Sequence, residues 1–445
     1  MRSKELIKSI ILILLVLMSA VLTYMTWNFS PDLANVDKQD NDKETEAKTI
    51  GKPLDQGMDK VVTPYQLIHS KGEDSQGMEA TKSNIEATLK PLKNYRVLRS
   101  EQMHSNHNLI IPDLSDDFLI LDFTYDMPLA TYLGQALNIN AKVPNNFKFD
   151  RLIVDNDKDG TVKLYAISKD RHNVVRMTTS AKLSQFEKVM KQQQKNMQPY
   201  TEIITNKDTI DKATHIFAPK APKGLKSYHT IYNRISVDTM NAILFNDSVV
   251  VRSSKSGNAT YNNNTGVANY SDDSEKYRYT NLSEDENRST NMKESIPSTY
   301  DYINNHGGFT DDFRLFNVDN KTGELTYQMF LNGRPTFNND DLNNIKVSWG
   351  DKGVFSYARA LLKANVTIDS GEDEVKLPGA ETVRAELANN PEINFEEVTN
   401  MTIGYNMNNK PDNTDIEIQR NSEFKPQWYV QYDGEWRAYS DGGLE

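Results

Sequence analysis

The 445-residue chain is acidic, with 62 Asp and Glu against 51 Lys and Arg and a net charge of −11, and it contains no cysteine. The charge argues against binding to nucleic acid or to anionic lipid, and the lack of cysteine excludes disulfides, thiol chemistry and thiolate metal sites. The remaining composition, 25% charged, describes a soluble body long enough for about two to four domains.

One apolar stretch interrupts this composition near the N-terminus. Residues 9–31 read SIILILLVLMSAVLTYMTWNFSP and carry no charged side chain. A helix over the apolar part, rising about 1.5 Å per residue, spans the roughly 30 Å hydrocarbon core of a bilayer. We therefore expect a transmembrane helix over residues 9–29, preceded by a cytoplasmic tail of residues 1–8.

The flanks of this span set its expected orientation. Arg2, Lys4 and Lys8 precede it against one acidic residue, and an acidic segment follows it. Positive charge before the span and acid after it place the N-terminus in the cytoplasm and the bulk of the chain outside the cell membrane. Lys4 and Lys8 are expected to anchor the inner interface, and Tyr24 and Trp27 the outer one, where amphipathic rings favour the headgroup layer.

A cleaved signal peptide is the alternative to an uncleaved anchor. Its apolar region normally covers about 7–15 residues and ends at a site of small side chains. Here the apolar run is longer, and the bulky segment from Tyr24 to Trp27 occupies the place of such a site. The sequence favours the uncleaved anchor.

The predicted membrane helix carries a stripe of small and hydroxyl-bearing residues. Ser19, Thr23 and Thr26 follow at i, i+4 and i+7, with Ala20 beside them. Such residues let helices approach closely and can hydrogen-bond across an interface. In a plain anchor, the hydroxyls would instead bond their own i−4 carbonyls. Both interpretations stay open.

The chain after the anchor divides into a linker and three predicted domains. Residues 30–52 are acidic and nearly free of large apolar side chains, which predicts a solvated spacer. An N-terminal extracellular domain is expected over residues 53–199, a central domain over 200–309 and a C-terminal domain over 310–445. Helices are predicted over residues 75–89, 128–137, 180–197, 236–245, 297–306 and 378–390. Strands are predicted over residues 118–125, 151–168, 202–204, 215–218, 312–331, 354–368 and 425–440.

The clearest amphipathic helix is the one over residues 180–197. Ser184 and Glu187 have the spacing of a capping box, and Pro199 follows the end of the pattern. Five apolar side chains share one face: Leu183, Phe186, Val189, Met190 and Met197. By contrast, residues 253–287 are rich in Ser, Asn, Tyr and Asp, which predicts solvent-facing strands and turns and no core.

Two hairpin-like segments echo each other. Arg151-Leu152 and Arg314-Leu315 are each followed at the same distance by a glycine, Gly160 and Gly323. A duplicated unit would explain the match. Generic hairpin chemistry, with glycine at a left-handed turn position, explains it equally well.

One motif resembles the start of a calcium loop. Asp155, Asp157, Asp159 and Gly160 fit the opening of an EF-hand, whose bidentate Glu stands at the twelfth position. That position holds Ala166, and strand-like residues flank the motif where helices are needed. A turn is therefore the favoured interpretation.

The histidines suggest little chemistry. His104 and His107 have i, i+3 spacing, but their surroundings carry little helical signal and no nearby carboxylate. No zinc-protease, serine-hydrolase or phosphate-loop motif occurs. Acidic residues are numerous enough for the carboxylate pair of a glycan hydrolase, yet nothing in the sequence selects one. We assign no catalytic, cofactor-binding or metal-ligating residue.

Several segments along the whole chain resemble one known family. They read LIKSIILILLVLMSAVLTYMTWNF (6–29), AILFNDSVVVR (242–252), TYNNNTGV (260–267), YDYINNHGGF (300–309), LPGAETVRAEL (377–387) and WYVQYDGEWRAY (428–439). Together they resemble the YycH family, accessory membrane proteins of the WalK/WalR (YycG/YycF) two-component system of Gram-positive bacteria.

The resemblance implies a fold and a role. It implies an α+β protein: a single N-terminal transmembrane helix, then an extracellular multi-domain body of mainly antiparallel sheets with a few packed helices. It also implies a non-enzymatic regulator that needs no cofactor and acts with YycI on the WalK sensor kinase, through transmembrane and extracellular contacts, in cell-wall metabolism. The alternatives are an extracellular binding module for a cell-wall fragment and a wall-acting hydrolase.

Overall fold

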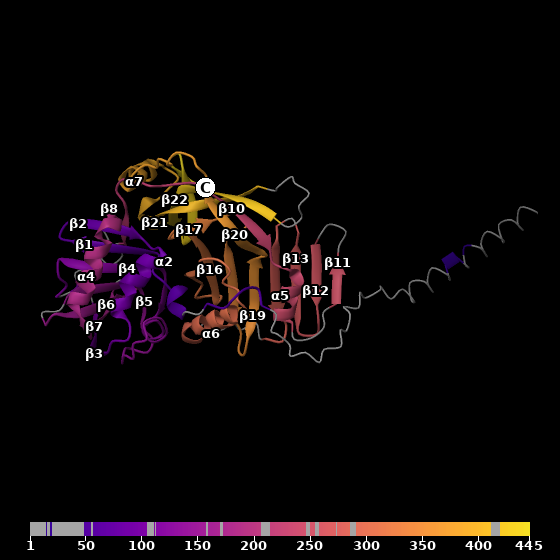
Figure 1. The fold of residues 1–445 in the computed structure, drawn as a ribbon, viewed down its shortest axis with the longest axis horizontal. Helices are drawn as coiled ribbons and strands as arrows, with labels where there is room; N and C mark the ends of the chain where they lie inside the picture. The colour runs from indigo at the N-terminus through magenta and orange to yellow at the C-terminus, as the bar shows by residue number, and fades with distance from the viewer. Residues whose placement is uncertain are drawn as a thin grey trace, which may run out of the picture.

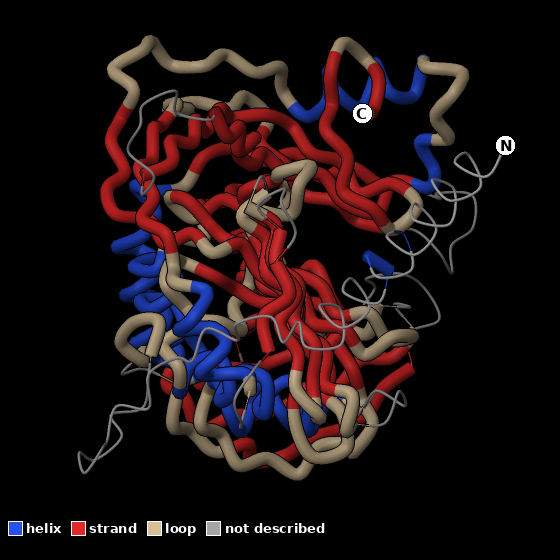
Figure 2. Tube along the Cα trace, turned by 90° about the vertical axis from the view of Figure 1, so that its right-hand side faces the viewer, coloured by secondary structure: helices blue, strands red, loops and turns tan. Residues whose placement is uncertain are grey.

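Two large sheets form the body of the protein, side by side along its long axis (Figure 1). Figure 2 shows strands through the middle of the molecule and helices at its periphery. The computed structural model describes residues 15, 18–19, 49–54, 57–104, 111, 113–156, 159–169, 172–205, 214–245, 250–253, 258–272, 274–284, 291–410 and 419–445.

The first sheet has nine strands, all paired antiparallel with their neighbours. In spatial order they are β3 (Val97–His104), β7 (Asn173–Lys182), β6 (Thr161–Ile167), β5 (Lys148–Asn156), β4 (Asp117–Pro128), β1 (Gln66–Lys71), β2 (Asp74–Glu79), β8 (Gln198–Thr205) and β9 (Thr214–Pro219). The predicted hairpin over residues 151–168 is confirmed as β5 and β6, and the two predicted strands at 202–204 and 215–218 are β8 and β9.

The second sheet has fifteen strands and one parallel pair among them, β17 with β21. Its main path is β11 (Val250–Ser253), β12 (Asn258–Asn262), β13 (Gly266–Ser271), β14 (Lys276–Asn281), β19 (Val354–Ala360), β18 (Asn344–Trp349), β16 (Glu324–Leu331), β17 (Arg334–Phe337), β21 (Val398–Lys410), β22 (Gln419–Tyr432), β10 (Tyr228–Arg234) and β20 (Leu362–Asp369). Off this path, β15 (Phe313–Val318) pairs with β16, β23 (Glu435–Ser440) with β22, and β24 (Gly443–Leu444) with β23.

Short helices pack on these sheets. The helices of the described residues are α2 (Lys82–Leu89), α3 (Leu129–Thr131) with the π-helical η3 (Tyr132–Ala136), α4 (Leu183–Gln193), α5 (Val237–Leu244), α6 (Met292–Asn305) and α7 (Ala380–Asn389). Single 3₁₀ turns are η1 (Met58–Lys60), η2 (Lys90–Leu92), η4 (Gln194–Asn196) and η6 (Phe395–Glu397). The predicted helices over residues 128–137, 236–245 and 378–390 are confirmed as α3–η3, α5 and α7.

The two sheets share one hydrophobic core. A single cluster of buried apolar side chains runs from Met58 to Phe424 and takes members from both sheets. At the junction, Arg314 of β15 donates a 2.6 Å hydrogen bond to the carbonyl of Ala80, which lies just after β2. A smaller aromatic cluster joins Tyr65, which immediately precedes β1, to Phe316 and Phe330 of the second sheet. The sheets are therefore packed as one body.

The predicted helix over residues 75–89 is wrong in its first half. Residues 74–79 form β2, which pairs with both β1 and β8. Gly77 faces the ring of Tyr200 so closely that a Cβ would lie 2.3 Å from it, so this glycine marks a close strand contact. The helix begins after Thr81, whose hydroxyl accepts from the backbone N–H of Asn84 at 3.2 Å.

The amphipathic helix predicted over residues 180–197 is shorter than expected. It runs from Leu183 to Gln193 as α4, because β7 extends to Lys182 and residues 194–196 form a 3₁₀ turn. The predicted capping box is wrong: the N-cap is Lys182, without a side-chain cap, and Ser184 already lies inside the helix.

The helix predicted from Pro297 begins five residues earlier. In α6, Pro297 lies inside the helix, and the N-cap is Asn291. The buried face explains the extension, because its 3–4 residue spacing continues upstream of the proline. This face consists of Met292, Ser295, Ile296, Thr299, Tyr300 and Ile303.

The segment over residues 253–287 contributes to the core, contrary to the sequence prediction. Its strands alternate, and one side of β13 and β14 is buried in the main cluster through Ala268, Tyr270, Tyr277 and Tyr279. Tyrosine supplies this core, and a count of aliphatic residues missed it.

The predicted domain borders do not coincide with breaks in the sheets. The border at 199/200 falls inside β8, and the border at 309/310 separates α6 from β15 within the second half. As a division into domains, they stay predictions.

In the echoed hairpins, Gly160 and Gly323 both have positive φ (71° and 69°), but Arg151 lies opposite Ile167 whereas Arg314 lies opposite Gln328. Both glycines therefore stand at left-handed turn positions, and duplication of the unit stays a hypothesis.

Candidate functional site

The predicted transmembrane interaction face lies almost wholly outside the described residues. Leu15, Met18 and Ser19 are the described part of the span, and they are helical. Among the described residues, no helix is long and apolar enough to cross a membrane. The interaction face and the interfacial anchors stay predictions. The positions outside the described residues are Ala20, Thr23, Thr26, Lys4, Lys8, Tyr24 and Trp27.

The Asp-rich motif belongs to the β5–β6 turn. Asp155 is buried, and its carboxylate accepts hydrogen bonds from the hydroxyl and backbone N–H of Ser115. Gly160 has a positive φ of 71°, and Ala166 lies in β6, while Asp157 is outside the described residues. Asp155 therefore ties a neighbouring loop to the sheet. No group of three His, Asp or Glu suited to a metal ion occurs in the described part of the chain.

The two histidines with i, i+3 spacing are not both among the described residues. His104 ends β3 and is exposed, and His107 lies outside the described residues. Other histidines pair with carboxylates of the first sheet that are distant in sequence. Two such pairs occur: His69 Nε2 lies 2.6 Å from Asp117 Oδ1, and His215 Nδ1 lies 2.6 Å from Glu202 Oε1.

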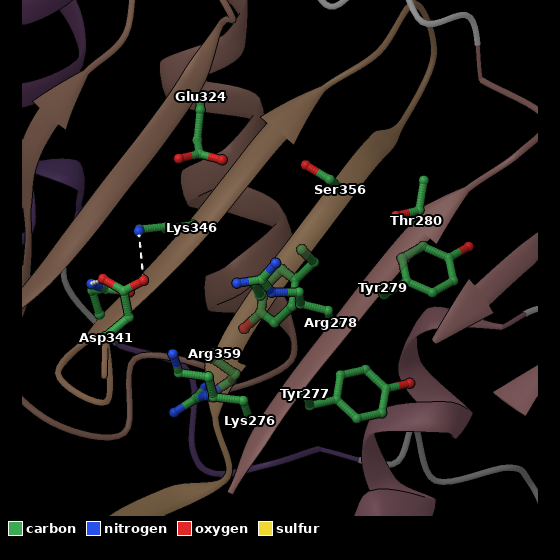
Figure 3. Close-up of a pocket in the computed structure, with 13 residues that line it drawn as sticks. Lys276, Tyr277, Arg278, Tyr279, Thr280, Glu324, Asp341, Lys346, Ser356 and Arg359 are labelled. Atoms are coloured by element: carbon green, nitrogen blue, oxygen red, sulfur yellow. Dashed lines mark hydrogen bonds and ion pairs between the residues drawn. The ribbon is translucent and has the colours of Figure 1, made fainter. Parts of the chain in front are cut away.

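A polar trough crosses the outer face of the second sheet, over β14, β19, β18 and β16 (Figure 3). Its volume is about 300 Å³. We take it as the candidate site because charged side chains from several strands border a floor of small residues. Two other hollows lie on the first sheet, one beside α4 and one beside Lys148.

Strand register places two cations across one alanine. Lys346 of β18 lies opposite Ala358 of β19, and Arg278 of β14 lies opposite the same alanine from the other side. Neighbouring strands are about 4.8 Å apart, so the two cation-bearing positions are separated by about 10 Å. Lys276 lies two residues before Arg278 and therefore on the same face of β14. The short side chain of Ala358 leaves open the space between these long ones.

A row of hydroxyls lies next to the cations. Ser356 of β19 is flanked by Thr280 of β14 and Ser348 of β18, and Ser348 faces Glu324 of β16. Ser348 is fully buried, and its Oγ has no hydrogen-bond partner among the described residues. Glu324, Ser356 and Thr280 line the trough. The trough thus offers hydroxyls along its length and a carboxylate at one end.

Lys276, Arg278 and Lys346 together form a row of positive charges, the cation row. An ion pair lies at the edge of this row. Lys346 Nζ lies 2.9 Å from Asp341 Oδ2, and Asn344 donates to Oδ1 of the same carboxylate at 3.1 Å. Burial alone would raise the pKa of Asp341, but hydrogen bonds from Lys346 and Asn344 and the charges of Lys346 and Lys276 lower it on balance. Arg278 is exposed and has no carboxylate partner among the described residues.

The inner face of the same strands is tightly packed. Tyr277 and Tyr279 alternate with the trough residues of β14 and point towards α5, where the Tyr279 ring lies edge-on to Phe245 at 5.1 Å. The Tyr277 hydroxyl donates to the side-chain oxygen of Asn241 at 2.7 Å. On β19, Arg359 donates to the carbonyl just after α6 at 2.7 Å. These contacts hold the strands that carry the trough.

This trough is not predicted from the sequence. The alternation from Lys276 to Thr280 shows that this strand has two different faces. Pairing it with residues 346 and 356–358 depends on register between strands that are far apart in the chain, which periodicity cannot supply.

Two sequence profiles of one family together cover most of the chain. The profile described as "YycH protein, N-terminal domain" matches residues 5–198, and "YycH protein, C-terminal domain" matches residues 213–441. The chain belongs to the YycH family. The family resemblance found in the sequence is confirmed, and the α+β fold dominated by antiparallel sheets is confirmed with it.

Two comparisons match this YycH-family chain to YycH from Bacillus subtilis. The sequence match, from strain 168, is described as "Two-component system WalR/WalK regulatory protein YycH" and is 20% identical over 453 residues, covering 97% of this chain and 95% of the relative. The structural match is the crystal structure of YycH from Bacillus subtilis, with a TM-score of 0.66 at 15% identity over 88% of this chain and 99% of that chain. The structural likeness shows a shared fold.

Proposed function

We propose that this YycH-family chain is a non-enzymatic, membrane-anchored regulator of a WalK-type sensor histidine kinase. The observation that carries the proposal is the relation, along 97% of this chain, to a protein described as a WalR/WalK regulatory protein. In this proposal the N-terminus is cytoplasmic and the body is extracellular. The chain acts together with YycI, through transmembrane and extracellular contacts, on signalling for cell-wall metabolism.

The mechanism follows from linkage. A bound helix changes the output of a kinase if it prefers one signalling state to the other. A preference of about 1–3 kcal/mol alters the balance of states about 5- to 150-fold. Close packing of small residues and interhelical hydrogen bonds supply energies of this size in membranes, which favours the stripe of Ser19, Ala20, Thr23 and Thr26 as the contact.

The body offers a fixed attachment for the chain that leads from the predicted anchor. Ile50 N–H donates to the carbonyl of His306 at 2.8 Å, and Leu54 N–H donates to Asn304 Oδ1 at 2.7 Å. The Asn304 amide in turn donates to the carbonyl of Leu54 at 3.3 Å. The C-terminal end of α6 thus holds the segment that enters the body. In this proposal, a displacement of α6 would move the point at which the linker leaves the body.

The test is a pair of variants within the predicted span. Ser19→Leu with Thr23→Leu removes the hydroxyls of the stripe, and Val21→Leu with Met25→Leu changes the opposite side of the same helical wheel. WalK-dependent phosphorylation of WalR is measured in cells with each variant and in cells without the chain. The proposal expects the stripe variant to resemble the deletion and the control to resemble the parent. Full regulation by the stripe variant would contradict membrane recognition.

A second candidate function is an extracellular binding module for a cell-wall fragment. The trough with Lys276, Arg278 and Lys346 favours it, because these cations gather on a chain whose net charge is −11. The two functions are compatible, since a ligand that prefers one state of the body would act through the same coupling.

A further inference from the structure

We propose that the trough over β14, β19 and β18 binds a carboxylate or phosphate group carried on a hydroxyl-bearing molecule of about the size of one sugar. The proposal deepens the second candidate function and rests on the trough alone, so it does not require kinase regulation. A volume of about 300 Å³ suits a single such unit.

The anionic group is placed by the cation row. Arg278 and Lys346 flank Ala358 on both sides, and their side chains are long enough to meet over it. A guanidinium presents a planar fork of N–H donors that fits carboxylate or phosphate oxygens in pairs, and an ammonium adds a compact charge. Ala358 provides the room, because a larger residue there would occupy the place of the anion.

The charges around the row favour one anion. Lys276, Arg278 and Lys346 face Asp341 and Glu324 in the trough, which leaves a local excess of positive charge on an acidic protein. Asp341 already bonds Lys346 and Asn344. It holds the Lys346 ammonium in place but does not use all three N–H donors of that ammonium, so donors remain for a ligand.

The hydroxyl row describes the body of the ligand. Thr280 and Ser356 can each donate and accept hydrogen bonds, and Glu324 at the end of the row only accepts them. A hydroxyl-rich carrier satisfies all three. Glu324 also repels a second negative charge. The ligand therefore carries its single anionic group towards Ala358 and its hydroxyls towards Glu324.

The experiment is calorimetric titration of the full-length protein in uncharged, sugar-free detergent at about 50 mM salt, where screening is moderate. Two anionic probes represent the two sources: N-acetylmuramic acid for a carboxylate and glycerol 3-phosphate for a phosphate. Their neutral counterparts are N-acetylglucosamine and glycerol. The variants are Arg278→Gln, Lys346→Gln, Ala358→Leu and Glu324→Gln, and the control is Arg96→Gln, which removes an exposed arginine before β3 on the first sheet.

The proposal expects saturable binding of at least one anionic probe and none of its neutral counterpart; the tighter probe identifies the anion. Arg278→Gln and Lys346→Gln should each weaken binding at least about tenfold. Ala358→Leu should weaken it similarly without changing charge, Glu324→Gln should strengthen it, and Arg96→Gln should leave it unchanged.

The proposal would be overturned if neither anionic probe saturated the protein by about 20 mM, because such binding is far weaker than that of a specific site of this kind. Equal binding of the neutral probes would also overturn it. So would undiminished binding of the anionic probe by Arg278→Gln, Lys346→Gln and Ala358→Leu alike. Such a failure would leave the regulator proposal intact, because that proposal is judged by WalR phosphorylation. Failure of the phosphorylation test would likewise leave the titration result standing.

Discussion

The hydroxyl of Tyr65 donates a 2.7 Å hydrogen bond to Asn400 Oδ1, although 335 residues separate the two positions. Tyr65 immediately precedes β1 in the first sheet, and Asn400 lies on β21 in the second. The same hydroxyl accepts from Gln66 Nε2 at 2.7 Å. This partly buried bond joins the beginning of the body to its last third, as expected if the two sheets unfold together.

Removal of the Tyr65 hydroxyl should therefore destabilise the whole body. Tyr65→Phe removes one hydrogen bond from each of Asn400 and Gln66, but Asn400 still accepts from Met401 N–H and Gln66 still donates to Asp122. The expected cost is therefore that of a lost hydrogen bond, about 0.5–1.5 kcal/mol. Tyr95→Phe is the matched control, because it removes an exposed hydrogen bond to Gln185 and should cost less than about 0.5 kcal/mol. Urea unfolding measures both. Two separate transitions in the parent protein, or equal effects of the two variants, would contradict the view of one cooperative body.

The buried ion pair of the first sheet gives a second prediction. Arg151 donates to both carboxylate oxygens of Asp122, at 3.0 and 3.2 Å, and both side chains are almost fully buried. Asp122→Ala leaves an unpaired buried guanidinium and should cost about 3–5 kcal/mol of unfolding free energy. The exposed pair of Glu101 with Arg176 is the control, and Glu101→Ala should cost about 0–1 kcal/mol. Similar losses in the two variants would show that burial of the first pair has no energetic consequence.

Two glycines with positive φ allow a matched test of the attachment at α6. Positions 307 (φ +62°) and 160 (φ +71°) both have a backbone conformation that favours glycine. A Cβ added to Gly307 would lie 2.0 Å from the carbonyl oxygen of Gly51, whereas a Cβ added to Gly160 would meet nothing within 4 Å. Gly160→Ala should cost about 1–2 kcal/mol from backbone strain alone. Gly307→Ala should cost more and should also release the hydrogen bond of Ile50 N–H to His306. Amide hydrogen exchange at Ile50 would reveal this release; exchange as slow as in the parent would contradict the proposed contact.

The Asp341 carboxylate in the trough should make the stability of the fold depend on pH in the acid range. Because the folded protein lowers the pKa of Asp341, the ionised form of this carboxylate stabilises the fold above the unfolded pKa of about 4, and that stability is lost as the pH falls through the lower folded pKa. The group is partly exposed, so the effect should stay below about 1 kcal/mol. The difference in unfolding free energy between the parent and Asp341→Asn should shrink as the pH falls from about 5 towards 3. Lys346→Gln should also reduce the change in unfolding free energy with pH over this range. An unchanged pH dependence in both variants would rule out the Asp341–Lys346 pair as its source.

The sequence predicted those elements whose signals are local. The hairpin of β5 and β6 has alternating apolar residues around a turn glycine, and α7 has a complete apolar stripe, so neither depends on distant partners. By contrast, residues 74–79 became a strand because β1 and β8 flank them, and the helical start at Met292 follows from a buried face that outweighs Pro297.

The candidate site lies beyond local signals for the same reason. Lys346 and Arg278 flank Ala358 only after β19 is inserted between β14 and β18, and no spacing within the sequence encodes that register. Family membership could be inferred from the sequence because the resembling segments extend along the whole chain and do not depend on any single site.

The central claim is recognition of the kinase through the predicted membrane helix. The most direct test is co-purification of WalK from membranes with the full-length chain and with a version whose residues 10–26 are replaced by an unrelated apolar helix, each in the presence of YycI. The account predicts that the full-length chain captures WalK and that the replacement loses it. Equal capture by both versions would move recognition to the exterior body, and no capture by either would contradict the regulator proposal itself.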